Sequence, residues 1–259
     1  MPFRLTNAPV SFQHYINDVL RPFLDIFASA YLNDILIFSE TLKEYKNHVR
    51  HVLEALSDTS LHLASEKCAF HKEFIKYLGF FITIGGVAPD PAKVATVQEW
   101  STKKSPIRCR TDVQRFLGFA GFYRRFIRDY SRVVLPLTRL TGEHVPFDWS
   151  SECEAALNTL KTAFTIAPDL HHFDHDREVI VETDASDFVS ASVLSHYGDD
   201  GIQHPVAFYS TKHSPAECNY KIYNKELMAI VRAFGEWRPE LKGPLFPIQV
   251  LSDHINLEY

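Results

Sequence analysis

The chain has 259 residues, of which 46% are hydrophobic, and a formal net charge of -5 from 27 basic and 32 acidic side chains. This length accommodates about two domains, and the apolar content excludes global disorder. No stretch approaches the roughly 18 uninterrupted apolar residues of a membrane span, and the N-terminus has no basic region followed by an apolar signal core. We expect an intracellular protein of the cytoplasm or nucleus that is not secreted and has no membrane partner.

The two halves of the chain differ in charge. Residues 1–150 carry 19 basic and 15 acidic side chains, whereas residues 151–259 carry 8 and 17. Ten basic residues lie in residues 103–139 against two acidic ones, an excess that is typical of surfaces that attract polyanions. The alternative is an ordinary solvated helix face. We assign the interleaved aromatic residues to a helix core and leave the arginines open between the two interpretations.

The first half begins with alternating short helices and strands. Apolar residues at helical spacing predict a helix over residues 11–20, and residues 41–57 form a second amphipathic pattern. Between them, residues 26–31 and 35–38 are apolar runs of strand length that flank a polar tip, which predicts a hairpin. The elements expected next are a hairpin over residues 74–84 with Gly79 inside it, a helix from Pro91 to Trp100, a polar linker over residues 101–110, and helices over residues 112–129 and 135–140.

The second half has a different order of elements. The pattern predicts a helix over residues 152–164, strands over residues 178–183, 189–195 and 206–210, a helix over residues 217–237 and a last strand over residues 246–251. Strands in series followed by a helix and a further strand indicate an α+β domain with a mixed sheet. Four widely spaced cysteines without Cys-x-x-Cys spacing predict free thiols: Cys68, Cys109, Cys153 and Cys218.

Three carboxylates lie where this second sheet would gather them. Asp184 and Asp253 each end a predicted strand, and Glu226 lies on the helix between. Clustered carboxylates repel one another and raise each other's pKa unless a cation is bound, and magnesium and manganese prefer such oxygen ligands. Spacing alone favours the simpler interpretation, in which these are three solvated acids.

Two further groups have a plain alternative as well. Asp34 lies at the tip of the first hairpin, but Asp and Asn are also the commonest turn residues, and composition alone favours a turn. His171, His172 and His175 offer a His-x-x-His pair, yet no further ligand stands at a matching spacing. For these histidines we expect a solvated loop rather than a zinc site.

Seven motifs in a fixed order connect the chain with a known family. They are residues 1–9 (MPFRLTNAP), Phe12-Gln13, residues 31–39 (YLNDILIFS), Tyr77-Leu78-Gly79, residues 116–127 with Phe116-Leu117-Gly118 and Tyr123-Arg124-Arg125, residues 182–186 (ETDAS), and Tyr220 with Lys225-Glu226-Leu227. In this order they resemble the pol polyprotein of gypsy-type LTR retrotransposons. The resemblance implies a partial reverse transcriptase palm at residues 1–85, thumb and connection at residues 86–150, and a ribonuclease H-like domain at residues 151–259.

The resemblance assigns roles to the first domain. Tyr31 to Asp34 is similar to the Tyr-x-Asp-Asp hairpin, so Asp34 is implied as a catalytic, metal-binding residue and Asn33 occupies the position of the first acid. Phe3, Arg4 and Tyr31, together with Leu78 and Gly79, match positions that contact the nucleotide or the primer.

Departures from the family pattern predict a chain without polymerase activity. Asn33 is neutral, which weakens the field of a magnesium pair, and Arg4 replaces a glycine that lets the backbone approach the nucleotide. The remaining polymerase acid is expected upstream of Met1.

The second domain keeps more of the pattern. Asp184, Glu226 and Asp253 match the first three metal-binding, catalytic acids of ribonuclease H, and His254 follows the third. The fourth acid is expected beyond Tyr259, which predicts at most weak cleavage of RNA.

The resemblance also implies cofactors and partners. These are Mg²⁺ or Mn²⁺, a template–primer or RNA–DNA hybrid, a dNTP for the family, and a virus-like particle as the family's location. The alternative function is that of a non-catalytic nucleic-acid-binding relic of a transposon polyprotein.

Overall fold

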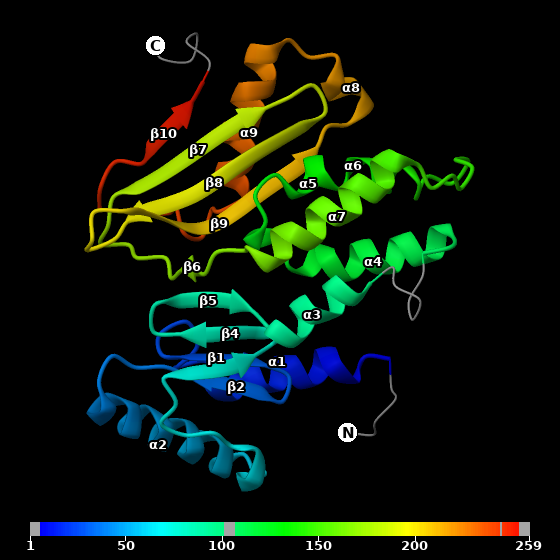
Figure 1. Cartoon of the computed structure of the whole chain (residues 1–259). Coiled ribbons are helices and arrows are strands. Elements are labelled where there is room, and N and C mark those ends of the chain that lie inside the picture. The colour runs from blue at the N-terminus through cyan, green and yellow to red at the C-terminus, as the bar shows by residue number, and fades with distance from the viewer. Residues whose placement is uncertain (1–5, 101–106, 244, 254–259) are drawn as a thin grey trace. The chain divides into compact units, whose positions relative to one another are not determined.

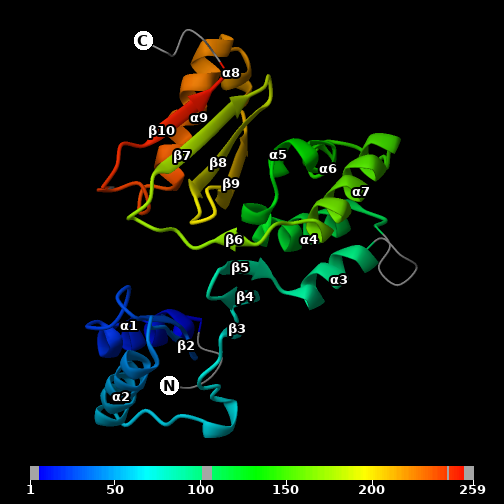
Figure 2. The same cartoon turned by 60° about the vertical axis from the view of Figure 1, so that its left-hand side comes forward.

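The computed structural model describes residues 6–100, 107–243 and 245–253, and it divides into two compact units, Met1–Leu78 and Gly79–Tyr259. Figures 1 and 2 show the elements of both units from two sides.

The first unit packs two helices against a β-hairpin. Its elements are α1 (Ala8–Leu20), β1 (Ala28–Tyr31), β2 (Asp34–Ile37), α2 (Leu42–Asp58), the 3₁₀ turn η1 (Ser65–Lys67) and β3 (Phe74–Tyr77). The core lies between the helices, where Ile16 and Leu20 of α1 meet Val52 and Leu56 of α2. The predicted helices and hairpin are confirmed.

The second unit starts with a small antiparallel sheet. Strand β4 (Phe80–Thr83) pairs with β5 (Gly86–Pro89), which pairs with β6 (Leu170–His171). Strands β3 and β4 lie on the two sides of Leu78-Gly79 as predicted, but β5 and β6 were not predicted. A Cβ at Gly86 would lie 2.2 Å from the carbonyl oxygen of Leu170, so the β5–β6 pairing needs glycine there.

Helices of the second unit bury its larger core. They are α3 (Pro91–Glu99), α4 (Arg110–Phe122), the 3₁₀ turn η2 (Arg124–Phe126), α5 (Tyr130–Val133), α6 (Leu135–Arg139) and α7 (Ser151–Thr165). The side chains of Phe116, Tyr123 and Phe126 are buried, which confirms the assignment of the aromatic residues to a core. The single helix predicted over residues 112–129 is wrong, because α4 ends at Phe122 and Asp129 adopts a left-handed conformation with φ 55°.

A four-stranded mixed sheet forms the other layer of the second unit. Its order is β10 (Gln249–Ser252), β7 (Val179–Ala185), β8 (Val189–Tyr197), β9 (Gln203–Lys212), with β10 parallel to β7 and the other pairs antiparallel. Helix α8 (Pro215–Cys218) leads into α9 (Ile222–Glu236), which packs against β7 and β8 in both views of the fold (Figures 1 and 2). The α+β class with a mixed sheet is therefore confirmed.

Two sequence-based boundaries in this layer are wrong. The helix predicted over residues 217–237 is broken, because Ser214 caps α8 and the chain leaves helical geometry before α9 starts after Lys221. The last strand begins at Gln249 rather than at residue 246. All four cysteines are free thiols, as predicted. Among the described residues, no helix combines the length and the apolar character that crossing a membrane requires.

Truncation of a core leucine tests the packing of the second unit. Leu157 on α7 is 0% exposed, and Leu157→Ala is expected to lower the free energy of unfolding by about 2–5 kcal/mol, because the change removes buried surface and leaves a cavity. Urea unfolding followed by circular dichroism measures the loss. The matched control is Leu227→Ala on α9, where the side chain is 51% exposed and the expected change is within about 0.5 kcal/mol. Equal losses in the two variants would contradict this core.

Candidate functional site: a cluster of three carboxylates

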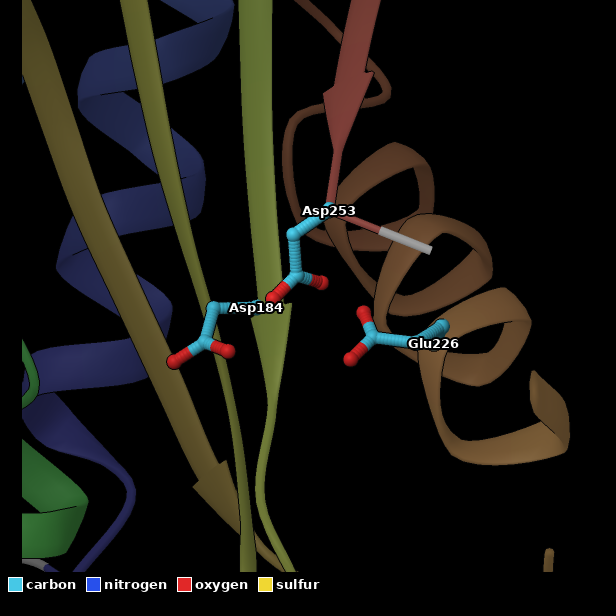
Figure 3. Close-up of side chains that lie close together, drawn as sticks. All are labelled: Asp184, Glu226 and Asp253. Carbon is cyan, nitrogen blue, oxygen red and sulfur yellow. The ribbon is translucent and has the colours of Figure 1, made fainter. Parts of the chain in front are cut away.

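Parallel pairing of β7 and β10 brings two aspartates together. Ser252 lies opposite Thr183, so the next residues, Asp253 and Asp184, stand side by side at the same end of the sheet. Both side chains are exposed. Figure 3 shows their carboxylates at the end of the strands, with Glu226 reaching toward them from α9.

Glu226 is the buried member of the cluster. It is 2% exposed, and its two oxygens accept hydrogen bonds from the backbone N–H of Ala185 at 3.2 Å and from the hydroxyl of Ser252 at 3.5 Å. These two donors come from the strands that carry the aspartates, so the contacts fix the glutamate relative to both. One oxygen from each of Asp184, Glu226 and Asp253 lies within 4.8 Å of the others.

Burial makes this glutamate difficult to ionise. Loss of hydration, with the nearby charges of Asp253 and Asp184, raises the pKa of Glu226 to about 6, although the hydrogen bonds from Ala185 and Ser252 act in the opposite direction. The cluster thus holds three carboxylates at a distance where neutral pH makes them repel one another. A cation bound beside the carboxylates would offset this electrostatic repulsion.

The residues present fit a divalent ion of the magnesium type. Carboxylate oxygens from three elements converge, which is the donor set that hard cations prefer. A cleft of about 330 Å³ borders the two aspartates and is lined in addition by Arg128, Glu182 and Ser192. The structure thus brings together all three acids that the sequence singled out in the second half.

An arginine that the sequence analysis did not single out also reaches this cluster. Arg132 of α5 donates from Nη2 to Oδ2 of Asp184 at 2.8 Å, and Arg128 lies 4.0 Å from Glu182. Both arginines belong to the basic stretch. The signal for Arg132 was limited to its place in that stretch, because it lies 52 residues from its partner in the sequence.

A second polar network supports the N-terminal part of α9. Lys225 is 3% exposed and donates to Oδ1 of Asp187 at 3.1 Å. The buried hydroxyl of Ser190 lies 2.7 Å from Nε2 of His213, and Nδ1 of the same ring lies 3.3 Å from the carbonyl oxygen of Asp187. The loop after β7 is therefore tied to α9 and to His213, directly after β9, and these contacts support the helix that carries Glu226.

The predicted polymerase residues of the first unit are arranged differently. Asp34 is exposed and pairs with Tyr31 across the hairpin, and Asn33 lies exposed in the turn. The amide of Gln13 holds this hairpin, because it accepts from the N–H of Leu32 at 2.7 Å and donates to the carbonyl of Ala30 at 3.1 Å.

No other metal-ligating group approaches Asp34 to form a cluster of three within the part of the chain that the structure describes. Phe3 and Arg4 lie outside the described residues.

Leu78 and Gly79 occupy a turn in which both residues have positive φ, 50° and 84°. Glycine is suited to such a conformation, whereas leucine adopts it at a cost. The hydroxyl of Tyr123 donates to the carbonyl of Gly79 at 3.1 Å and would lie 3.2 Å from an added Cβ. The group that lies close to Gly79 is therefore the side chain of Tyr123, the C-terminal cap residue of α4.

The basic stretch contains arginines of two kinds. Arg124 is structural, since its guanidinium donates to the carbonyl of Ser210 and lies over the rings of Tyr130 and Tyr209. Arg125 and Arg128 are exposed. Lys103 and Lys104 lie outside the described residues.

The prediction of a solvated loop is wrong for His171. This residue lies on β6, and its ring stacks on that of His204 with centroids 3.9 Å apart. Burial and the nearby His204 lower the pKa of His171. His172 and His175 are exposed and lie outside strands, as expected.

Comparison with known proteins agrees with this geometry. Residues 149–248 match the family model "RNase H-like domain found in reverse transcriptase", and residues 1–82 match "Reverse transcriptase (RNA-dependent DNA polymerase)". The fold resembles foamy viral protease-reverse transcriptase in complex with dsDNA, with a TM-score of 0.79 and 24% identity over 98% of this chain and 52% of that one. The same viral protein in complex with RNA/DNA hybrid gives a TM-score of 0.77, with 24% identity over 96% of this chain and 33% of that one.

Fold and site thus define a reverse transcriptase segment joined to an RNase H-like domain. Transposon Tf2-3 polyprotein of Schizosaccharomyces pombe is 34% identical over 257 residues, which are 99% of this chain and 19% of the relative. Transposon Tf2-7 polyprotein of the same organism shows the same identity and coverage. The chain belongs to the reverse transcriptase and ribonuclease H family of LTR retrotransposon polyproteins, and it spans about a fifth of the length of these relatives.

The raised pKa of Glu226 predicts that the free energy of unfolding of the metal-free protein falls as the pH rises. The folded carboxyl ionises at about 6 and the unfolded one near 4.5, so the folded state loses stability as the pH rises through this window. Relative to Glu226→Gln, the wild-type protein is expected to lose about 2 kcal/mol of unfolding free energy between about pH 4 and pH 7. Urea unfolding in the presence of EDTA measures the difference.

Glu217 is the control with the opposite sign. Hydrogen bonds from Ser214 and Arg232 lower the pKa of Glu217 to about 2, so its ionised form stabilises the fold and this contribution disappears as the pH falls from the unfolded value near 4.5 through 2. Glu217→Gln is therefore expected to destabilise the protein at pH 7 and to have less effect in acid. The same pH trend in both variants would contradict the environments described for the two glutamates.

Proposed function

We propose that the carboxylate cluster hydrolyses the RNA strand of an RNA–DNA hybrid with Mg²⁺ or Mn²⁺ as cofactor. The observation that carries this proposal is the convergence of Asp184, Glu226 and Asp253 within 4.8 Å at one end of the mixed sheet. The proposed ribonuclease H domain covers residues 151–259, with the thumb and connection at residues 86–150 and the palm segment at residues 1–85.

The chain's own residues supply a fixed set of acceptors. Glu226 is held by Ala185 and Ser252, so its oxygens are oriented before any ligand arrives. Asp184 and Asp253 are exposed at the cleft, and Arg132 holds one oxygen of Asp184. A bound divalent ion supplies an activated water at near-neutral pH and neutralises charge that develops on the phosphate.

The proposed substrate follows from charge and from the relatives. Exposed Arg125 and Arg128 lie in the connection segment that leads to the cleft, where cationic side chains contact phosphates of a nucleic acid backbone. One structural neighbour was solved in complex with RNA/DNA hybrid, which supports the same partner for this chain.

For the first unit we propose a template–primer contact without DNA synthesis. Asp34 is the only carboxylate within the Tyr31 to Asp34 motif, and Asn33 offers a neutral amide in place of the first acid. Tyr31 and Leu78, with Phe3 and Arg4, remain the proposed positions for nucleotide or primer in this unit, and Gly79, the first residue of the second unit, remains one as well. A second candidate function is nucleic-acid binding without catalysis, favoured by the pairing of Arg132 with Asp184, which occupies one of the acids.

Hydrolysis is tested with an end-labelled RNA–DNA hybrid in Mg²⁺ and in Mn²⁺. Slow cleavage is expected for the wild-type protein, and Asp184→Asn is expected to lower the rate at least about 100-fold, because loss of one charged group at such a site costs about 3 kcal/mol of transition-state stabilisation.

The matched control for hydrolysis is Asp199→Asn. The Asp199 side chain is 93% exposed beyond the far end of β8, so the rate should stay within twofold of wild type, roughly the scatter expected of surface changes. Cleavage that persists in Asp184→Asn would refute hydrolysis at this cluster, and absence of cleavage with retained hybrid binding would favour the non-catalytic function.

Primer extension is expected to be absent on a poly(rA) template with either metal ion. The reason is the neutral Asn33, which leaves the hairpin with a single acid. Incorporation of labelled dTTP measures the activity. Robust incorporation that disappears in Asp34→Ala would contradict the proposal for the first unit.

A further inference from the structure

Arg132 projects from a short helix that is anchored to the mixed sheet. The backbone N–H of Ser131 donates to Oγ of Ser210 at 2.9 Å, and the hydroxyl of Ser131 donates to the carbonyl oxygen of Ser210 at 2.9 Å. Arg124, seven residues before Ser131, donates to the same carbonyl. Three donors thus hold the segment around α5 to one residue of β9.

The register of the sheet places this anchor in line with the carboxylate cluster. Asp184 of β7 lies opposite Ala191 of β8, which lies opposite Ser210 of β9. Side chains of directly opposite residues lie on the same face of a sheet, and two strand spacings separate the outer members by about 10 Å. Ala191 has a small side chain. Arg132, which follows the anchored Ser131, can therefore extend across β8 and reach Asp184.

The contact that results is exposed and exchangeable. The side chains of Arg132 and Asp184 are 45% and 51% exposed, and the second guanidinium contact, with Asp129, is longer at 4.0 Å. Exposed ion pairs of this kind contribute little to stability. The guanidinium therefore neutralises an acid of the cluster without being locked to it.

A cation that holds Asp184 competes with any metal ion for the negative charge of the same carboxylate. Once a metal ion takes that carboxylate, the planar guanidinium is released beside the cleft with five N–H donors, and Asp129, at 4.0 Å, is too distant to occupy them with short hydrogen bonds. A phosphate is the ligand that matches this fork, since it accepts paired hydrogen bonds from arginine. Arg128, also at the cleft, adds a second positive charge at its edge.

We propose that Arg132 alternates between two anions: it holds Asp184 in the free protein and binds a backbone phosphate of the nucleic acid when a divalent ion occupies the carboxylate cluster. This inference deepens the proposed function and rests on it for the identity of the nucleic acid. It makes Arg132 a positioning residue that couples metal binding to strand binding.

The proposal predicts effects of opposite sign in one variant. Arg132→Gln removes the competitor and is expected to tighten Mn²⁺ binding about two- to fivefold, the range that corresponds to an exposed ion pair. In saturating Mn²⁺ the same variant is expected to bind an RNA–DNA hybrid more weakly. The slope of log affinity against log salt concentration is expected to fall by about one, which corresponds to the loss of one phosphate contact.

Two binding measurements test these signs without relying on turnover. Isothermal titration gives the Mn²⁺ affinity, with Asp184→Asn identifying the heat that belongs to this cluster. Fluorescence anisotropy over a salt series gives the affinity for a labelled hybrid whose RNA strand carries 2′-O-methyl groups that resist cleavage. Arg132→Lys keeps a cation at this position and is expected to lie between wild type and Arg132→Gln in both measurements.

Arg115→Gln is the matched control. Arg115 is a 71% exposed arginine of the same unit that pairs with Asp112 on its own helix, and its loss should change neither affinity. Unchanged or weaker Mn²⁺ binding in Arg132→Gln, or unchanged hybrid binding, would overturn the proposal. If wild-type protein cleaves no hybrid but both opposite shifts are observed, the proposed hydrolysis fails while the role of Arg132 stands.

Discussion

Repulsion among three carboxylates is the constraint around which the second unit is arranged. Two aspartates stand at the ends of neighbouring parallel strands, and a glutamate that is 2% exposed is held between them by a backbone N–H and a hydroxyl. These two hydrogen bonds lower the pKa of Glu226, whereas burial and the neighbouring charges raise it, with a net result of about 6. The network from Lys225 to Asp187 and from Ser190 to His213 keeps α9 in position against this repulsion. Such strain is typical of sites that bind a cation, where fixed acceptors avoid reorganisation on binding.

The same constraint explains why the segment around α5 matters to the site. Of the arginines in the basic stretch, Arg124 contacts aromatic rings and a carbonyl oxygen and fixes the segment, whereas Arg132 contacts an acid of the cluster. Composition alone does not distinguish these arginines, because both lie in the basic stretch. Their different roles depend on the register of the sheet, in which Asp184 of β7 and Ser210 of β9 both lie opposite Ala191 of β8.

Element types were predictable from the sequence more often than their ends. The amphipathic pattern of α2 and the capping pair Thr41 and Glu44 are local, and the helix agrees with its prediction. The break between α4 and η2 was missed because the apolar stripe continues through Tyr123 and Phe126 into the same core although the backbone turns. The three acids of the cluster were named from strand ends and from the family resemblance. Arg132 was not, because a contact across 52 residues depends on strand order and register that no local pattern encodes.

Parallel pairing of β10 with β7 has a further consequence for the order in which the site assembles. A parallel neighbour requires a crossover, and here the chain runs through β8, β9 and α9 before β10 returns beside β7. Asp184 and Asp253 therefore meet only when β10 pairs with β7, and contacts of such large sequence separation form slowly. During synthesis, Asp184 and Glu226 are made well before Asp253. The full cluster is consequently a property of the completed sheet, so a nascent or partly folded chain does not present the three-acid site to metal ions.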